Sequence, residues 1–169
     1  MRLGLGAAAV VAALLLVVLI DRDRVTHFTL EPSSRIEVRM GTALPSPTGQ
    51  TLTGRVMLNE DTPERTLASA TVTPQGWQGQ APVEFTSTGV EALSSISLVM
   101  TGTLRVHERA APITVRVNLS EPPITNPQGQ LVRRVTAQTQ IDPALFGGPP
   151  MAVPPTFLIH AVLLEAAPP

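Results

Sequence analysis

Two patterns of apolar residues divide the chain into two parts. Residues Leu3–Ile20 form an apolar block without a charge, whereas apolar and polar residues alternate along most segments after residue 24. A period of two is typical of β-strands that bury one face. We therefore expect an N-terminal apolar segment, residues 1–24, and an all-β domain, residues 25–169.

The alternating segments predict about eight antiparallel strands. Most prolines fall between these segments, as expected if the segments pair in a sheet. Many short strands joined by short links indicate a sandwich or a closed barrel, and the length of the segment 95–106 favours a barrel, in which strands tilt and wrap. Gly54 and Gly102 stand inside predicted strands, which indicates close approach of backbones there. The segments are residues 35–40, 53–59, 68–74, 82–87, 95–106, 112–119, 131–141 and 156–165.

One apolar stripe of these strands is expected to face the barrel interior, where it would line any ligand site. Its members are the residues that share one parity within each segment. They are Ile36, Val38, Val56, Leu58, Phe85, Leu98, Met100, Leu104, Val115, Val117, Val135, Phe157 and Ile159.

The stretch "TGTLRVHERAAPITVRVNL", residues 101–119, holds the one polar cluster that interrupts two apolar arms. Alternation breaks after Val106 and resumes at Ile113. We interpret "HERAAP" as a polar hairpin loop, with Pro112 at the start of the next strand, and not as a catalytic centre.

The N-terminal apolar block is long enough to cross a membrane. Its 18 residues would span about 27 Å as a helix, against a hydrocarbon core of roughly 30 Å. A cleaved signal peptide is the alternative, but "DRDRVTHF" follows the block without the small-x-small pair that cleavage requires. We therefore expect residues 3–20 to be a retained single span. The usual arrangement of such an anchor places the domain in the periplasm or another extracytoplasmic space.

Composition and motif content argue against several functions. A net charge of −1 gives no electrostatic basis for binding nucleic acid. The chain has no Cys, and its three His are scattered without metal-ligand spacing. No nucleophile-elbow motif occurs, and the paired carboxylates Glu60 and Asp61 fall in a predicted turn. We expect no catalytic residue, no metal and no cofactor.

Several segments resemble the YceI-like family. "HFTLEPSSRIEV", "LTGRVMLNEDTPERTLASATV", "PVEFTSTGVEAL", "MTGTLRVHERAAPITVRVNL", "TAQTQIDPALFG" and "FLIHAVLLEA" follow one another in the order of the family's segments, over about residues 26–166. The resemblance implies an antiparallel lipocalin-like β-barrel around an elongated apolar cavity, here preceded by one N-terminal transmembrane helix. It also implies a periplasmic protein that binds a lipid or an isoprenoid. The segment that usually separates the small-residue strand from the Phe strand is shortened here to "PQGWQGQA".

Two roles remain open at this point. The last strand is apolar on both faces, so Leu158, Val162 and Leu164 would face outward, and Trp77 lies in a connecting loop. These four residues are candidate contacts with other membrane-protein subunits. Our first interpretation is therefore a non-catalytic accessory subunit of a membrane complex, with a filled barrel. The alternative is a periplasmic lipid or isoprenoid carrier of the YceI-like type, with a cavity of several hundred Å³.

Overall fold

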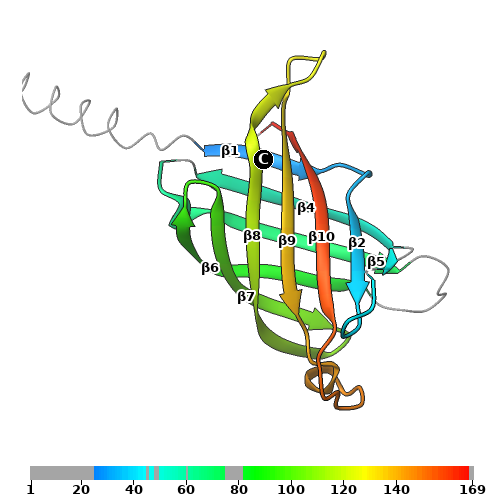
Figure 1. The fold of residues 1–169 in the computed structure, drawn as a ribbon. Coiled ribbons are helices and arrows are strands. Elements are labelled where there is room, and N and C mark those ends of the chain that lie inside the picture. The colour runs from blue at the N-terminus through cyan, green and yellow to red at the C-terminus, as the bar shows by residue number, and fades with distance from the viewer. Residues whose placement is uncertain (1–24, 45, 48–49, 60, 75–81, 168–169) are drawn as a thin grey trace, which may run out of the picture.

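The structure, a computed structural model, describes residues 25–44, 46–47, 50–59, 61–74 and 82–167. It contains ten strands and two short 3₁₀ turns (Figure 1). The strands are β1 (Val25–Leu30), β2 (Arg35–Arg39), β3 (Ser46–Pro47), β4 (Gln50–Asn59), β5 (Leu67–Pro74), β6 (Val83–Ser94), β7 (Ser97–Val106), β8 (Arg109–Thr125), β9 (Leu131–Gln140) and β10 (Thr156–Glu165), and the 3₁₀ turns are η1 (Pro63–Arg65) and η2 (Pro143–Phe146).

Eight of these strands close into an antiparallel barrel, so the predicted barrel is confirmed. The ring includes β1, which was not among the predicted segments, in place of the predicted segment 35–40, which forms β2. The pairing order is β1-β4-β5-β6-β7-β8-β9-β10, and β1 pairs with β10 to complete the ring. Strands β8, β9, β10 and β2 run side by side, and β4 to β7 cross behind them (Figure 1). Closure leaves the ring strands with neighbours on both sides and encloses one face of the sheet.

Strands β1 and β2 pair with the same side of β10, and a turn at residues 31–34 separates them. β1 pairs with the end of β10 and β2 with its beginning. The buried Ser34 stabilises the break, because its Oγ accepts a hydrogen bond from the Val162 N–H at 3.1 Å. The side-chain hydroxyl thus replaces a backbone acceptor that the bent strand no longer presents.

The hairpin between β7 and β8 is tighter than predicted. Only His107 and Glu108 form the turn, and His107 adopts a left-handed conformation with φ of 54°. Pro112 does not start the second strand but lies within it, opposite Thr103. This position tolerates a proline because β8 begins to pair with β9 only at Arg116. The prediction of a turn is confirmed, whereas the predicted loop length is wrong.

No helix among the described residues is long and apolar enough to cross a membrane. The predicted span at residues 3–20 and the predicted contact Trp77 lie outside the described residues.

Candidate ligand-binding cavity

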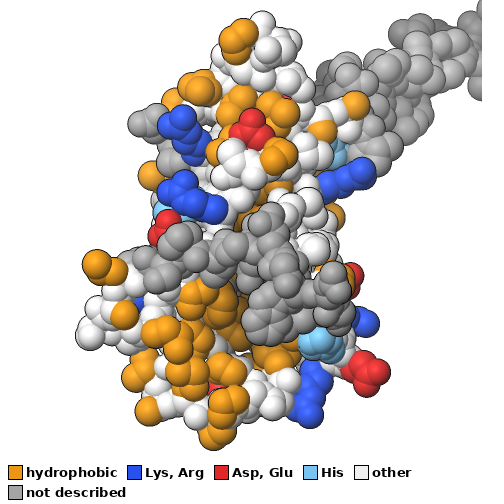
Figure 2. All heavy atoms as spheres, turned by 90° about the vertical axis from the view of Figure 1, so that its right-hand side faces the viewer, with side chains coloured by type: hydrophobic (Ala, Val, Ile, Leu, Met, Phe, Trp, Pro, Cys, Tyr) orange, Lys and Arg blue, Asp and Glu red, His pale blue; other side chains and the backbone are white. Residues whose placement is uncertain are grey.

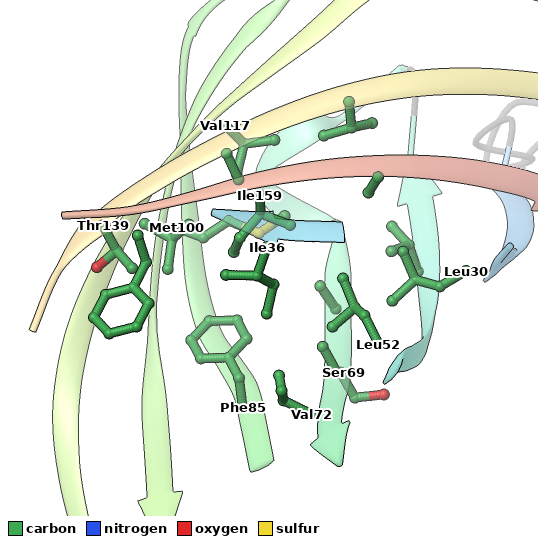
Figure 3. A pocket seen from close by; sticks show the side chains of 18 of the residues that line it. Leu30, Ile36, Leu52, Ser69, Val72, Phe85, Met100, Val117, Thr139 and Ile159 are labelled. Atoms are coloured by element: carbon green, nitrogen blue, oxygen red, sulfur yellow. The ribbon is translucent and has the colours of Figure 1, made fainter. Parts of the chain in front are cut away.

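The barrel encloses an apolar cavity of about 310 Å³. Ligand pockets usually measure roughly 300–1,000 Å³, so this interior can accept a small ligand or one chain of a larger one. Side chains from all parts of the ring line it, and Ile36, Leu52, Val72 and Phe85 converge on the same space (Figure 3). The expectation of a filled barrel is therefore wrong.

The structure places nearly all of the predicted interior stripe in the wall of this cavity. The lining includes Ile36, Val56, Leu58, Phe85, Leu98, Met100, Leu104, Val115, Val117, Val135, Phe157 and Ile159. Val38 is the exception. It pairs with Phe157 of the cavity wall on one side and with Ser46 of the short strand β3 on the other, but it does not itself line the cavity.

Leu30 and Leu52 also line the cavity, although they were not predicted as site residues. Leu52 has the parity of Val56 but precedes the segment in which alternation was recognised. Leu30 shares its parity with the buried Phe28. For Leu52, the available signal was the same period of two, extended by one pair of residues before the predicted segment; Leu30 belongs to β1, which was not among the predicted segments.

Among the described residues, the lining contains no charged side chain, and three of these lining residues carry a hydroxyl group: Thr66, Ser69 and Thr139. Thr139 Oγ1 donates to the Thr114 carbonyl oxygen at 2.8 Å, and Thr66 Oγ1 accepts from the Asn59 N–H at 3.2 Å. Both hydroxyls already serve the backbone of the barrel, and Ser69 is exposed at the margin. The wall therefore offers a ligand dispersion contacts and few hydrogen bonds.

Phe85 owes its place in the cavity to Gly102 on the neighbouring strand β7. A Cβ at Gly102 would collide with the Phe85 ring and would lie 2.5 Å from the Thr86 carbonyl oxygen. The aromatic ring covers the missing side chain, as aromatic residues do over strand glycines. The predicted close approach at Gly102 is thus confirmed, and Gly54 makes a similar one against Ser69 and Ala70.

The two ends of the barrel differ. The cavity reaches the end at which β5, β7 and β9 finish, where Val72, Val106 and Thr139 belong to its wall; we call this end the mouth. At the opposite end, a smaller cavity of about 160 Å³ is lined by the buried Arg133 and Asn59. Leu58, Leu98 and Leu119 border both spaces and separate them.

The outward-facing residues of β10 are half-buried. Leu158, Val162 and Leu164 lie on the face away from the cavity, and their role as partner contacts stays a prediction. His160 lies on the same face, with its Nε2 3.6 Å from a Glu37 carboxylate oxygen. Among the described residues, no group of three or more His, Asp or Glu side chains could hold a metal ion.

Comparisons with known proteins find barrels of similar fold among solved structures. Neither a scan against models of protein families nor a search of curated proteins finds a match. The crystal structure of Burkholderia cenocepacia BcnA matches with a TM-score of 0.60 and 13% identity, over 79% of this chain and 98% of that one. The Campylobacter jejuni YCEI protein matches with a TM-score of 0.57 and 11% identity, over 76% of this chain and 91% of that one. The fold is therefore YceI-like, and the predicted resemblance is confirmed at the level of the fold.

Proposed function

We propose that this YceI-like barrel binds one apolar chain of a lipid or isoprenoid compound in its interior and catalyses no reaction. The observation that carries the proposal is a cavity of about 310 Å³ whose wall, over the residues that the structure describes, carries no charged side chain. The similar fold of the two solved structures supports it.

The physical driving force for binding is the removal of hydrocarbon from water. Each buried methylene group contributes about 0.8 kcal/mol, so about ten of them contribute roughly 8 kcal/mol, part of which offsets the freedom lost on association. Affinity should therefore rise with chain length until the chain fills the cavity. A charged head group would find no partner in the wall, so it would remain at the mouth.

The carrier function is better supported than the accessory-subunit function. A barrel that serves only for docking needs no hollow interior, and empty space in a core costs stability. The apolar outer face of β10 is the observation that still favours docking, but its residues are half-buried by the barrel itself.

The proposal retains the membrane anchor at residues 3–20 and an extracytoplasmic location. The measurement for the anchor is the intact mass of the protein recovered from carbonate-washed membranes. A full-length mass in the membrane pellet supports a retained span, whereas a product that begins after residue 20 and washes off supports a cleaved signal.

The ligand site can be tested by filling the cavity from one side chain. Ala137 faces the cavity in the middle of β9, opposite Val117 and Ile159. Ala137→Phe should lower the affinity of the full-length protein for a fluorescent fatty acid or farnesyl analogue by about tenfold or more, equivalent to about 1.4 kcal/mol or more.

The matched control is Gln138→Phe, which places the same ring on the exposed outer face of the same strand. It should leave affinity within about twofold, a difference of less than 0.5 kcal/mol by the same conversion. Equal affinities of the two variants, both folded by circular dichroism, would exclude the interior as the binding site.

A further inference from the structure

Strands β8 and β9 separate where they approach the mouth. Their backbone pairing ends at Arg116 and Gln138. β8 begins at Arg109, however, and β9 continues to Gln140. Among the described residues, 109–115 of β8 are therefore not paired with β9. We call this unpaired stretch between the two strands the slot.

A side-chain hydrogen bond spans the slot. Thr139 Oγ1 donates to the Thr114 carbonyl oxygen at 2.8 Å. Because the backbone groups of alternate residues point to the same neighbouring strand, Pro112 also faces the slot, where it presents a carbonyl group but no N–H. β8 and β9 can therefore move apart at the slot without breaking backbone hydrogen bonds between them.

The slot lies between the interior cavity and a groove on the outer face of the barrel. Ile113 and Thr139 stand on its two sides and border both spaces. Ile113 points inward, yet it is half-buried, whereas its inward-facing neighbours Ala111 and Val115 are buried. The apolar cavity and the outer surface therefore approach each other at the slot.

The place where β5 and β6 separate differs from the slot. Backbone pairing between those strands ends at Ser69 and Thr86. Beyond it, Ala68 on β5 lines the cavity, but Ser87, which bonds to it from β6, is buried and does not line the cavity. At the slot, by contrast, side chains of both strands line the cavity. The slot is therefore the better candidate for a route into the interior.

The connection between β9 and β10 lies beside the slot and is apolar. η2 packs against β8, and Leu145 borders the outer groove. Gly147 lies against the Arg109 guanidinium at the start of β8. Residues 143–155 contain no charged side chain, and Figure 2 shows hydrophobic side chains gathered over the lower part of this end of the molecule. An apolar chain that passed through the slot would therefore meet apolar side chains outside the barrel as well as inside.

The outer groove also contains polar side chains, which the interior largely lacks. They are Thr101, Thr114, Arg116, Gln138 and Gln140. Arg116 is exposed and stands at the end of the slot, where pairing with β9 begins. Within the part of the chain that the structure describes, it forms no ion pair. A guanidinium binds carboxylate and phosphate oxygens through paired N–H donors, so the groove offers an anionic group the partner that the cavity wall does not.

We propose that an amphiphile with an anionic head group, such as a long-chain carboxylate, binds across the slot. Its apolar chain lies in the cavity, and its head group lies in the outer groove beside Arg116. The inference rests on the proposed function, to which it adds a side entrance for the chain and a class of head group. The charge needs no partner in the apolar wall, because it stays outside the barrel.

The head-group site is tested on the full-length protein with two ligands that differ only in the head group. Dodecanoate and dodecanol are each measured by displacement of a neutral fluorescent probe. Arg116→Gln should weaken dodecanoate binding about fivefold, the upper end for an exposed ion pair, and change dodecanol binding by less than about twofold. Arg55→Gln is the matched control, because Arg55 is an exposed arginine on β4 that does not border the groove; it should weaken neither ligand. Unchanged dodecanoate affinity in Arg116→Gln, or an equal loss in both variants, would overturn the head-group site.

The entrance is tested by linking the two sides of the slot. The chain has no Cys, so Thr114→Cys and Gln140→Cys can be combined in one variant and joined by the shortest bis-maleimide that reacts with both. These positions would face each other if the pairing register of β8 and β9 continued, and both border the groove. The matched control joins Asn118→Cys to Thr136→Cys, two exposed positions at which the same strands are paired.

The link across the slot should slow both uptake and release of the neutral probe by about tenfold or more and leave its Kd unchanged, whereas the control link should change neither rate by more than about twofold. Unchanged rates in the linked slot, or equal slowing by both links, would overturn the side entrance and indicate entry through the open end of the barrel. Failure of the unaltered protein to bind either ligand or the probe would instead refute the proposed function.

Discussion

Gly102 illustrates how one residue shapes the cavity. Because it lacks a Cβ, the Phe85 ring can lie directly over the backbone of β7 and contribute to the cavity wall. The same position shows what the sequence can reveal at this scale. A glycine within an alternating segment indicates close approach, but which side chain approaches depends on the register of β6 against β7, which the sequence does not contain.

Substitution of Gly102 should destabilise the barrel through this contact. Gly102→Ala forces the Phe85 ring and the Thr86 carbonyl to move, and overpacking of this kind costs about 1–3 kcal/mol. The measurement is urea unfolding of the single variants and of the double variant with Phe85→Leu. Because the two residues touch, the double variant should lose less stability than the sum of the singles. Additivity within about 0.5 kcal/mol would contradict the contact.

The elements follow from the alternation of side chains, with departures where strands end or bend. The predicted segments 131–141 and 156–165 match the bounds of β9 and β10 to within one residue, because a closed barrel buries one face along the whole strand. The second half of β6 was not predicted. A register shift between Ser87 and Gly89 interrupts the period of two there, and a bulge leaves no such regular pattern in the sequence. The turn at His107 was predicted, but not its two-residue length, because nothing in the neighbouring sequence requires a left-handed residue there.

The buried Ser87 hydroxyl replaces a backbone hydrogen-bond acceptor at the point where β5 and β6 separate. Backbone pairing ends at Ser69 and Thr86, and Ser87 Oγ then accepts the Ala68 N–H at 2.8 Å. Ser87→Ala leaves that N–H without its acceptor, so we expect a loss of about 1–3 kcal/mol in the free energy of unfolding. Thr88→Ala is the control, since Thr88 is exposed, and it should change stability by less than about 0.5 kcal/mol. Equal losses in both variants would argue against this role of Ser87.

The β7–β8 turn offers the opposite test, a stabilising change. His107 has a φ of 54°, a conformation that costs a non-glycine residue roughly 1–2 kcal/mol. His107→Gly should therefore raise the free energy of unfolding by about 0.5–1 kcal/mol, after the greater freedom of glycine in the unfolded chain is taken into account. Glu108→Gly has no such conformation to relieve and should lower stability. Ligand affinity should be unchanged in both; a loss of affinity in His107→Gly would point to a binding role for this histidine.

At the scale of the whole molecule, the account rests on a barrel with a hollow apolar interior. The interior stripe could be predicted from alternation alone, since parity decides which side chains face inward. The volume left between those side chains could not be predicted, because it depends on how far the ring of strands opens. The hollow interior could therefore be recognised only in the structure. It favours binding of a ligand over a purely structural role.

The central claim is that the cavity holds an apolar chain, and native mass spectrometry of the full-length protein extracted from its own membranes in mild detergent tests it most directly. The account predicts a discrete added mass of lipid size, one per monomer, which survives gentle activation and is absent from Ala137→Phe but present in Gln138→Phe. Recovery of the unaltered protein without any bound small molecule, together with other membrane subunits in fixed proportion, would contradict it and support the docking role.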